Sequence, residues 1–97
     1  MAARPDLSLE QWITVGKNKA VVSRVYKDGP ADGEVVYLNG RNRAVHADIS
    51  WTGTGWEFLK QDGAARYAEK EARLRPFIHI LHADHRYGRK SVHGMAP

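Results

Sequence analysis

Three histidines recur at intervals of three residues, at His79, His82 and His85, and Asp84 lies beside the last of them. Imidazoles three residues apart on a helix share one face and can bind the same divalent metal ion. His85, however, would lie nearly two helical turns from His79, and the chain has no cysteine to complete a site. Because a metal site needs convergent ligands and supporting partners, we expect surface histidines here, with no metal and no cofactor.

A second group with catalytic residue types is His46, Asp48 and Ser50, at alternate positions of one segment. A histidine beside a carboxylate is a common general base, and a nearby serine completes the residue types of a nucleophilic triad. Alternate polar residues are also typical of the solvated face of a strand, and neighbours on one strand seldom reach triad geometry. We therefore expect a solvated strand face, and a protein that is not an enzyme.

Aromatic side chains are the third source of chemistry, because exposed rings beside arginines can stack on nucleic-acid bases or on peptide prolines. A domain of 97 residues needs most of its large rings in the core, so we expect one or two of them to be partly exposed. The candidate binding residues are Tyr37, Arg41, Arg43, His46 and Trp56.

The net charge of +4 and the pI of about 9.6 invite a nucleic-acid partner. The charges are unevenly distributed, however. Residues 64–97 carry seven Lys and Arg against three Asp and Glu, whereas the preceding residues sum to zero. Charge alone therefore does not require a nucleic-acid-binding face on the first two thirds of the chain.

The clearest element that would position these residues is a strand over 43–51. One face carries four apolar side chains, Val45, Ala47, Ile49 and Trp51, and the period of two predicts one buried and one solvated face. Further strands are expected at 11–16, 20–26, 34–38 and 56–60. Turn residues separate them, notably Asn39-Gly40, which readily supplies positive φ angles, and the Thr-Gly-Thr-Gly run at 52–55.

The last third of the chain leaves two alternatives open. Apolar residues at 74, 77, 78 and 81 have the helical period, and Pro76 suits the first turn of a helix. Phe, Ile and the preceding proline also favour a final strand over 77–81. With the helix, the fold is mainly β with one short C-terminal helix: a strongly bent antiparallel sheet, or a partly open barrel of about five strands.

Several segments resemble small, functionally uncharacterised bacterial SH3-like barrel proteins. The resemblance covers residues 15–85 and rests on hydrophobic and turn residues, chiefly Gly33–Leu38, Asp48–Trp51 and Trp56–Phe58, followed by the apolar pairs at 77–78 and 80–81. It implies a bacterial protein with an SH3-like fold. From the residues themselves we expect a single domain over 11–83, after a loose lead-in at 1–10 and before a disordered basic tail at 84–97. It brings no catalytic residues with it, because a fold does not imply a function.

We expect a cytoplasmic protein, because the chain lacks cysteine, an N-terminal apolar signal segment and a run long enough to span a membrane. The function that we expect is a non-catalytic binding module for a protein segment or for a second copy in a homodimer, with no membrane partner. One alternative is a nucleic-acid-binding module that uses surface aromatics and the basic C-terminal third. Another is a small histidine-dependent enzyme.

Overall fold

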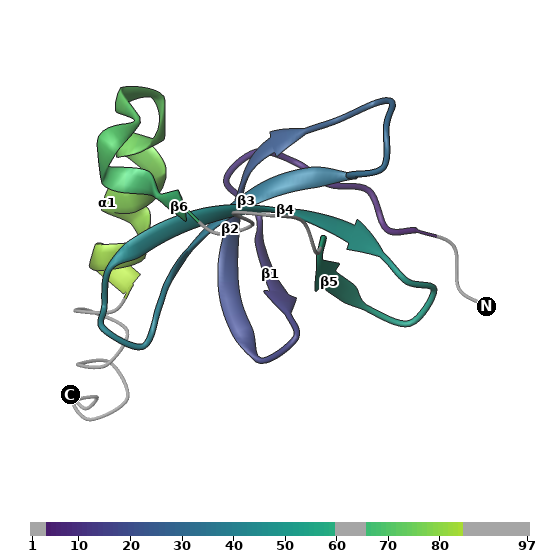
Figure 1. Ribbon diagram of the computed structural model, residues 1–97, viewed down its shortest axis with the longest axis horizontal. Helices are drawn as coiled ribbons and strands as arrows, with labels where there is room; N and C mark the ends of the chain where they lie inside the picture. The colour runs from purple at the N-terminus through teal and green to yellow at the C-terminus, as the bar shows by residue number, and fades with distance from the viewer. Residues whose placement is uncertain (1–3, 60–65, 85–97) are drawn as a thin grey trace, which may run out of the picture.

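Five strands that follow one another along the chain form a barrel (Figure 1). In the computed structural model, which describes residues 4–59 and 66–84, they are β1 (Trp12–Val15), β2 (Asn18–Val25), β3 (Gly33–Leu38), β4 (Ala44–Trp51) and β5 (Trp56–Phe58). Next come strand β6 (Arg66–Tyr67), the 3₁₀ turns η1 (Ala68–Lys70) and η2 (Ala72–Leu74), and helix α1 (Arg75–Ala83). The predicted mainly β fold with one short C-terminal helix is confirmed.

The barrel closes because its first and last strands meet. Each strand pairs antiparallel with the next, and β5 pairs parallel to β1 through Val15 and Trp56. The Gly16 N–H donates to the Trp56 carbonyl at 3.3 Å. The added strand β6 pairs with β4 at Val45 and His46, at the opposite end of β4 from β5. This barrel with one extra strand fits the small SH3-like fold expected from the sequence.

The barrel interior is filled by the side chains that alternate inward along the strands. Its buried residues are Val15, Ala20, Val22, Val35, Ile49 and Trp56. The segment before β1 contributes as well, because Leu7 packs against this core, whereas Leu9 is 58% exposed. Gly33 lies close to Leu7. A Cβ atom at position 33 would come 2.9 Å from Leu7 Cδ1 and 2.8 Å from the Arg24 carbonyl oxygen, so only glycine fits there without a shift.

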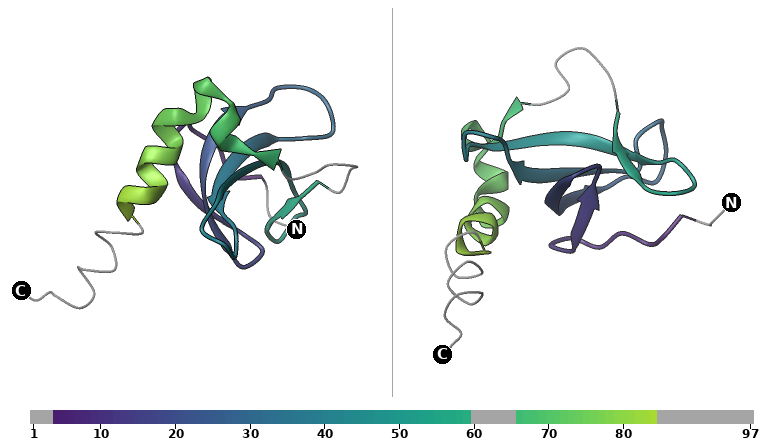
Figure 2. Two further views of the ribbon diagram at one scale, coloured as in Figure 1. Left: turned by 60° about the vertical axis from the view of Figure 1, so that its left-hand side comes forward. Right: turned by 90° about the horizontal axis from the view of Figure 1, so that it is seen from below.

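A second core lies outside the barrel, where α1 packs on β2 and β3, and η1 packs on β4 (Figure 2). It buries Val21, Val36, Ala44, Ala68, Leu74 and Leu81. The prediction that the alternate face of β4 is solvated is therefore wrong, since Ala44 is fully buried and His46 is 9% exposed. A strand that is covered on both faces loses the contrast between a wet and a dry side.

The helical alternative for the last element is the one that forms. Pro76 lies in the first turn of α1, where its missing N–H removes no helical hydrogen bond. Leu81 is buried, and Phe77, Ile78 and Ile80 pack around the second core. Lys19 Nζ lies 3.2 Å from Asp84 Oδ2 just beyond the helix. Within the described residues, α1 and its neighbours fall far short of the length and apolarity needed to cross a membrane.

The β3–β4 turn differs in detail from the sequence expectation. Its positive φ is at Asn42, with a value of 59°, and not at Gly40. The Asn39 side-chain oxygen accepts hydrogen bonds from the backbone N–H groups of Arg41 and Arg43, at 2.9 and 3.0 Å. This side-chain cap stabilises a longer turn than the two-residue Asn-Gly hairpin.

Candidate functional site

A carboxylate buried against the outer face of the barrel gathers three polar side chains. Glu34 on β3 is 4% exposed, and its Oε1 accepts hydrogen bonds from Ser23 Oγ and Arg73 Nη1, both at 2.8 Å. Its Oε2 lies 2.9 Å from His46 Nδ1 and 3.0 Å from Arg73 Nη2. Since Ser23 and His46 come from the flanking strands and Arg73 from η2, this Glu34 cluster fastens η2 to the barrel.

The Glu34 cluster contains the residue types of a hydrolytic triad in an order that does not support that chemistry. In a triad the imidazole lies between the hydroxyl and the carboxylate. Here the Glu34 carboxylate lies between Ser23 and His46. Asp48, the expected partner of His46, accepts a hydrogen bond from the Tyr26 hydroxyl at 3.3 Å instead. Among the described residues no serine hydroxyl bonds to the His46 ring, and the contacts of the cluster instead join η2 to β2, β3 and β4.

The sequence contains one signal for this cluster. Glu34 is a lone charge in a strand that otherwise consists of Gly33 and the residues of Val35–Leu38. A charged side chain in such a buried run needs partners to offset its desolvation. This pattern indicates that Glu34 is a buried acid. Spacing alone does not identify Arg73, 39 positions later, as its partner.

The charge of Glu34 makes the stability of the fold depend on pH. Burial raises the pKa of Glu34, but hydrogen bonds from Arg73, Ser23 and His46 outweigh burial and lower the pKa from 4.5 to about 2. Because the folded pKa lies below the ordinary value, this stabilisation is complete above about pH 4.5 and is lost as the pH falls toward 2.

We expect the free energy of unfolding to fall between about pH 5 and pH 2 by about 3 kcal/mol more in the wild type than in Glu34→Gln. Urea denaturation at several pH values measures this difference, and the variant controls for all other carboxylates. Parallel pH profiles for the two proteins would show that Glu34 is not the titrating group.

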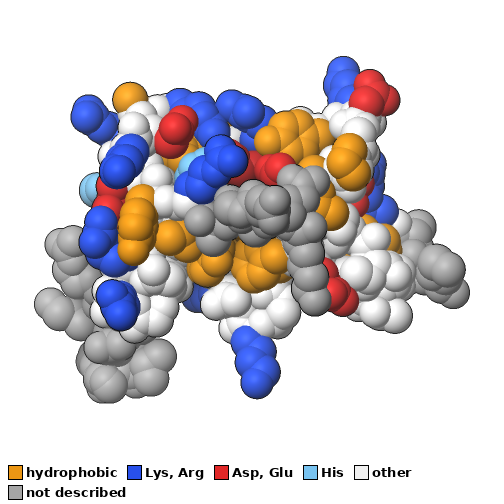
Figure 3. Space-filling view, in the orientation of Figure 1, with side chains coloured by type: hydrophobic (Ala, Val, Ile, Leu, Met, Phe, Trp, Pro, Cys, Tyr) orange, Lys and Arg blue, Asp and Glu red, His pale blue; other side chains and the backbone are white. Residues whose placement is uncertain are grey.

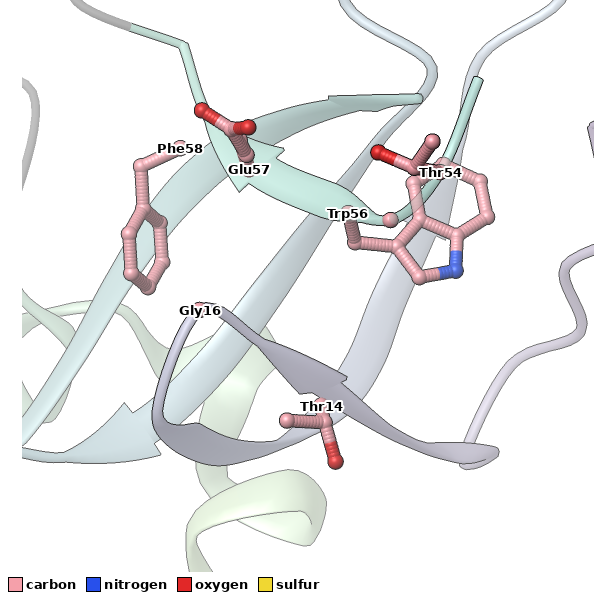
Figure 4. Close-up of a pocket in the computed structure, with 7 residues that line it drawn as sticks. Thr14, Gly16, Thr54, Trp56, Glu57 and Phe58 are labelled. Atoms are coloured by element: carbon pink, nitrogen blue, oxygen red, sulfur yellow. The ribbon is translucent and has the colours of Figure 1, made fainter. Parts of the chain in front are cut away.

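A separate site lies at the seam where β1 and β5 diverge (Figure 4). It is an open groove of about 600 Å³, lined by Thr14, Gly16, Thr54, Gly55, Trp56, Glu57 and Phe58. Trp56, one of the predicted binding residues, is 7% exposed, and its ring meets the Trp51 ring edge-on at 5.1 Å. Trp56 therefore shapes the groove mainly from within the core, and the half-buried Phe58 and the exposed Glu57 border the space beside it.

The groove exposes an edge of β5. The Leu59 N–H donates to the Asp48 carbonyl at 2.9 Å, so the backbone groups of Leu59 and Glu57 face β4. The N–H and C=O of the intervening Phe58 consequently face the opposite edge. On that edge β1 pairs with β5 only at Val15 and Trp56, because the chain turns away at Gly16, whose φ is +61°. Within the described residues, no strand pairs with Phe58 on this side.

The other predicted binding residues are divided among different places. Tyr37 and Arg43 come together at Tyr67, which is not among the predicted binding residues. Arg41 is exposed in the β3–β4 turn, and His46 belongs to the Glu34 cluster. The centroid of the Tyr37 ring also lies 5.0 Å from that of Phe58, which lines the groove. The predicted residues thus do not form one site.

The C-terminal histidines face a shallow part of the helix surface. His79 and His82 line a space of about 400 Å³ together with Glu69, Arg75 and Ile78. Across residues 4–59 and 66–84, no group of three His, Cys, Asp or Glu side chains is arranged to hold a metal ion. His85, the third member of the predicted series, lies outside the described residues, as does all of the predicted tail at 84–97 except Asp84, which caps α1.

Comparison of the chain with protein-family models, with curated proteins and with solved structures finds no significant match. The resemblance to small bacterial SH3-like proteins therefore stays a prediction. The function has to be argued from the groove, the Glu34 cluster and the surface around Tyr67.

Proposed function

We propose that this protein is a non-catalytic binding module that takes an extended segment of a partner protein into the groove beside β5. The observation that carries the proposal is the divergence of β1 from β5, which leaves the backbone groups of Phe58 facing an open groove of about 600 Å³. An extended peptide can bind such an edge as an added strand, with its backbone groups pairing with those of Phe58.

The side chains of β5 define the chemistry of the segment. Phe58 and Glu57 project to opposite sides of β5 (Figure 4). Because an added strand also alternates its side chains, one set lies on the Phe58 side and the next on the Glu57 side. Glu57 carries the only charge among the residues that line the groove. We infer a partner segment in which an apolar residue alternates with a lysine or arginine.

The histidines support binding over catalysis. The His46 Nδ1 is 2.9 Å from Glu34 and the Ser23 hydroxyl bonds to the same carboxylate, so the two side chains do not bond to each other. Neither His79 nor His82 lines the groove. A general base must reach the proton that it removes, and no histidine of the described residues lines the groove to do so.

The proposal is tested by panning a random peptide library against the wild type and measuring enriched peptides by calorimetry. Filling the groove with Gly55→Trp should weaken binding at least about tenfold, because a bulky side chain there occupies the peptide position. A Cβ at Gly55 meets nothing within 4 Å and its φ is not left-handed, so the variant should fold. Gly40→Trp, at an equally open glycine in the β3–β4 turn, is the matched control and should bind normally.

Charge reversal by Glu57→Lys should weaken the same peptides about two- to fivefold, the effect of one exposed ion pair, while Asp6→Lys should not. Peptides that bind Gly55→Trp as well as the wild type would overturn the groove assignment. So would concentration-dependent dimerisation of the wild type that Gly55→Trp abolishes, because a second copy would then be the occupant. A library that yields no binder would also count against the proposal.

A further inference from the structure

A second pocket lies at the other end of β4 and shares no lining residue with the groove. It measures about 270 Å³ and is lined by Tyr37, Asn39, Val45, Arg66 and Tyr67. The two residues of β6 pair with Val45 and His46 and so place Tyr67 on the same side of the sheet as Val45. A pocket of this volume can hold one planar ring of a ligand. We call it the Tyr67 pocket.

The ring of Tyr67 is held in place although it is 43% exposed. The Arg43 guanidinium lies over it, with its central carbon 4.6 Å from the ring centroid. Arg43 is itself fixed, because its Nη2 and Nε donate to Glu69 Oε1 at 2.7 and 3.2 Å. A ring that is oriented before a ligand arrives loses little conformational entropy when the ligand binds. Exposed, pre-oriented aromatic rings are the platforms on which nucleic-acid bases stack.

The polar groups around the pocket favour an anionic ligand. Arg66 lines the pocket and is exposed. Two further exposed arginines contact lining residues: Arg43 lies over Tyr67, and the backbone N–H of Arg41 donates to the Asn39 side chain. Glu69 offsets the charge of Arg43. The Asn39 Oδ1 already accepts two backbone hydrogen bonds, which leaves its amide N–H groups to donate. Lys and Arg side chains gather more widely on the half of the molecule that carries α1 and β6, with acidic residues interspersed (Figure 3). A cationic surface that extends beyond the pocket fits a chain of phosphates better than a single one.

We propose that the Tyr67 pocket binds one base of a single-stranded nucleic acid, with the base stacked on the face of Tyr67 opposite Arg43 and the flanking phosphates beside Arg66 and Arg41. Stacking uses the face of a base and not its edge, so this site should tolerate different sequences. The proposal is independent of the peptide groove, because the two sites have different lining residues.

The test is an amide NMR titration of the full chain with an oligothymidine of about eight nucleotides, at about 50 mM and about 200 mM salt. We expect localised shifts at residues of the Tyr67 pocket, and an affinity that falls about sevenfold between the two salt concentrations if two phosphates are neutralised.

Tyr67→Leu should weaken binding about tenfold, whereas Tyr67→Phe, which keeps the ring, should bind like the wild type. Arg66→Gln should reduce both affinity and salt dependence, and Lys27→Gln, an equal charge change in the β2–β3 loop, should change neither.

Three results would overturn the proposal. One is an absence of shifts at the lower salt concentration. Another is an affinity that Tyr67→Leu and Arg66→Gln leave unchanged, which would place the nucleic acid elsewhere. The third is saturable binding of thymidine monophosphate as tight as that of the oligonucleotide, since the site would then recognise a free nucleotide and not a strand.

Discussion

Replacing Glu34 by alanine is expected to lower the free energy of unfolding by about 3 kcal/mol, near the lower end of the range for breaking a buried ion pair. The Glu34 side chain is 5% exposed and accepts hydrogen bonds from Arg73 and Ser23. Its loss leaves these donors and His46 without their shared partner. The Arg73 side chain is 36% exposed, so water can partly replace the carboxylate, which keeps the loss below the upper end of the range.

Urea denaturation, monitored by circular dichroism, measures this decrease in the free energy of unfolding. Glu57→Ala removes an exposed carboxylate from β5 and should change stability by less than about 0.5 kcal/mol. Since Arg73 lies in η2, amide hydrogens of α1 should also exchange faster in Glu34→Ala than in the control. A loss below about 1 kcal/mol, with unchanged exchange in α1, would show that the Glu34 cluster does not hold η2 on the barrel.

Replacing Leu74 by alanine is expected to cost about 2–5 kcal/mol, the usual range for emptying a buried leucine site. Leu74 is fully buried between η2 and the outer face of the barrel, in the core that also contains Val21, Val36 and Leu81. A domain of this size has a total stability of about 5–15 kcal/mol, so the variant should be partly unfolded well below the melting temperature of the wild type.

Thermal and urea unfolding of Leu74→Ala test this expectation, and Leu9→Ala is the control because Leu9 is 58% exposed. NMR signals of the barrel interior and of α1 should disappear together, since the second core connects them. If α1 is lost first and the barrel keeps its stability, the helix layer is a separate unit that docks on a barrel able to fold alone.

The two proposed sites supply controls for each other. Gly55→Trp changes the groove at one end of β4, and Tyr67→Leu changes the Tyr67 pocket at the other. If each variant loses only its own ligand, the peptide and nucleic-acid functions are separate. If Gly55→Trp also loses the oligonucleotide, the contact of Tyr37 with Phe58, at 5.0 Å between ring centroids, is the direct connection through which the two sites would be coupled.

Local patterns predict much of the barrel. The alternation from Val45 to Trp51 predicts the long strand β4 and its inward face, and the Thr-Gly-Thr-Gly run predicts the turn that follows it. The same kind of reasoning leaves the last element open between helix and strand, because Phe and Ile suit both. Packing of Leu81 on the outer face of β2 and β3 selects the helix.

Long-range contacts account for what local patterns leave open. Alternation predicts that β4 has two faces but not that the 3₁₀ turns cover the second one, so it predicts a solvated His46, whereas His46 is buried beside Glu34. The partnership of Glu34 with Arg73 and the pairing of Val15 with Trp56 join residues that are far apart in the chain. Spacing and periodicity describe neighbours within a strand or helix, whereas burial and site geometry depend on which distant surface packs against it.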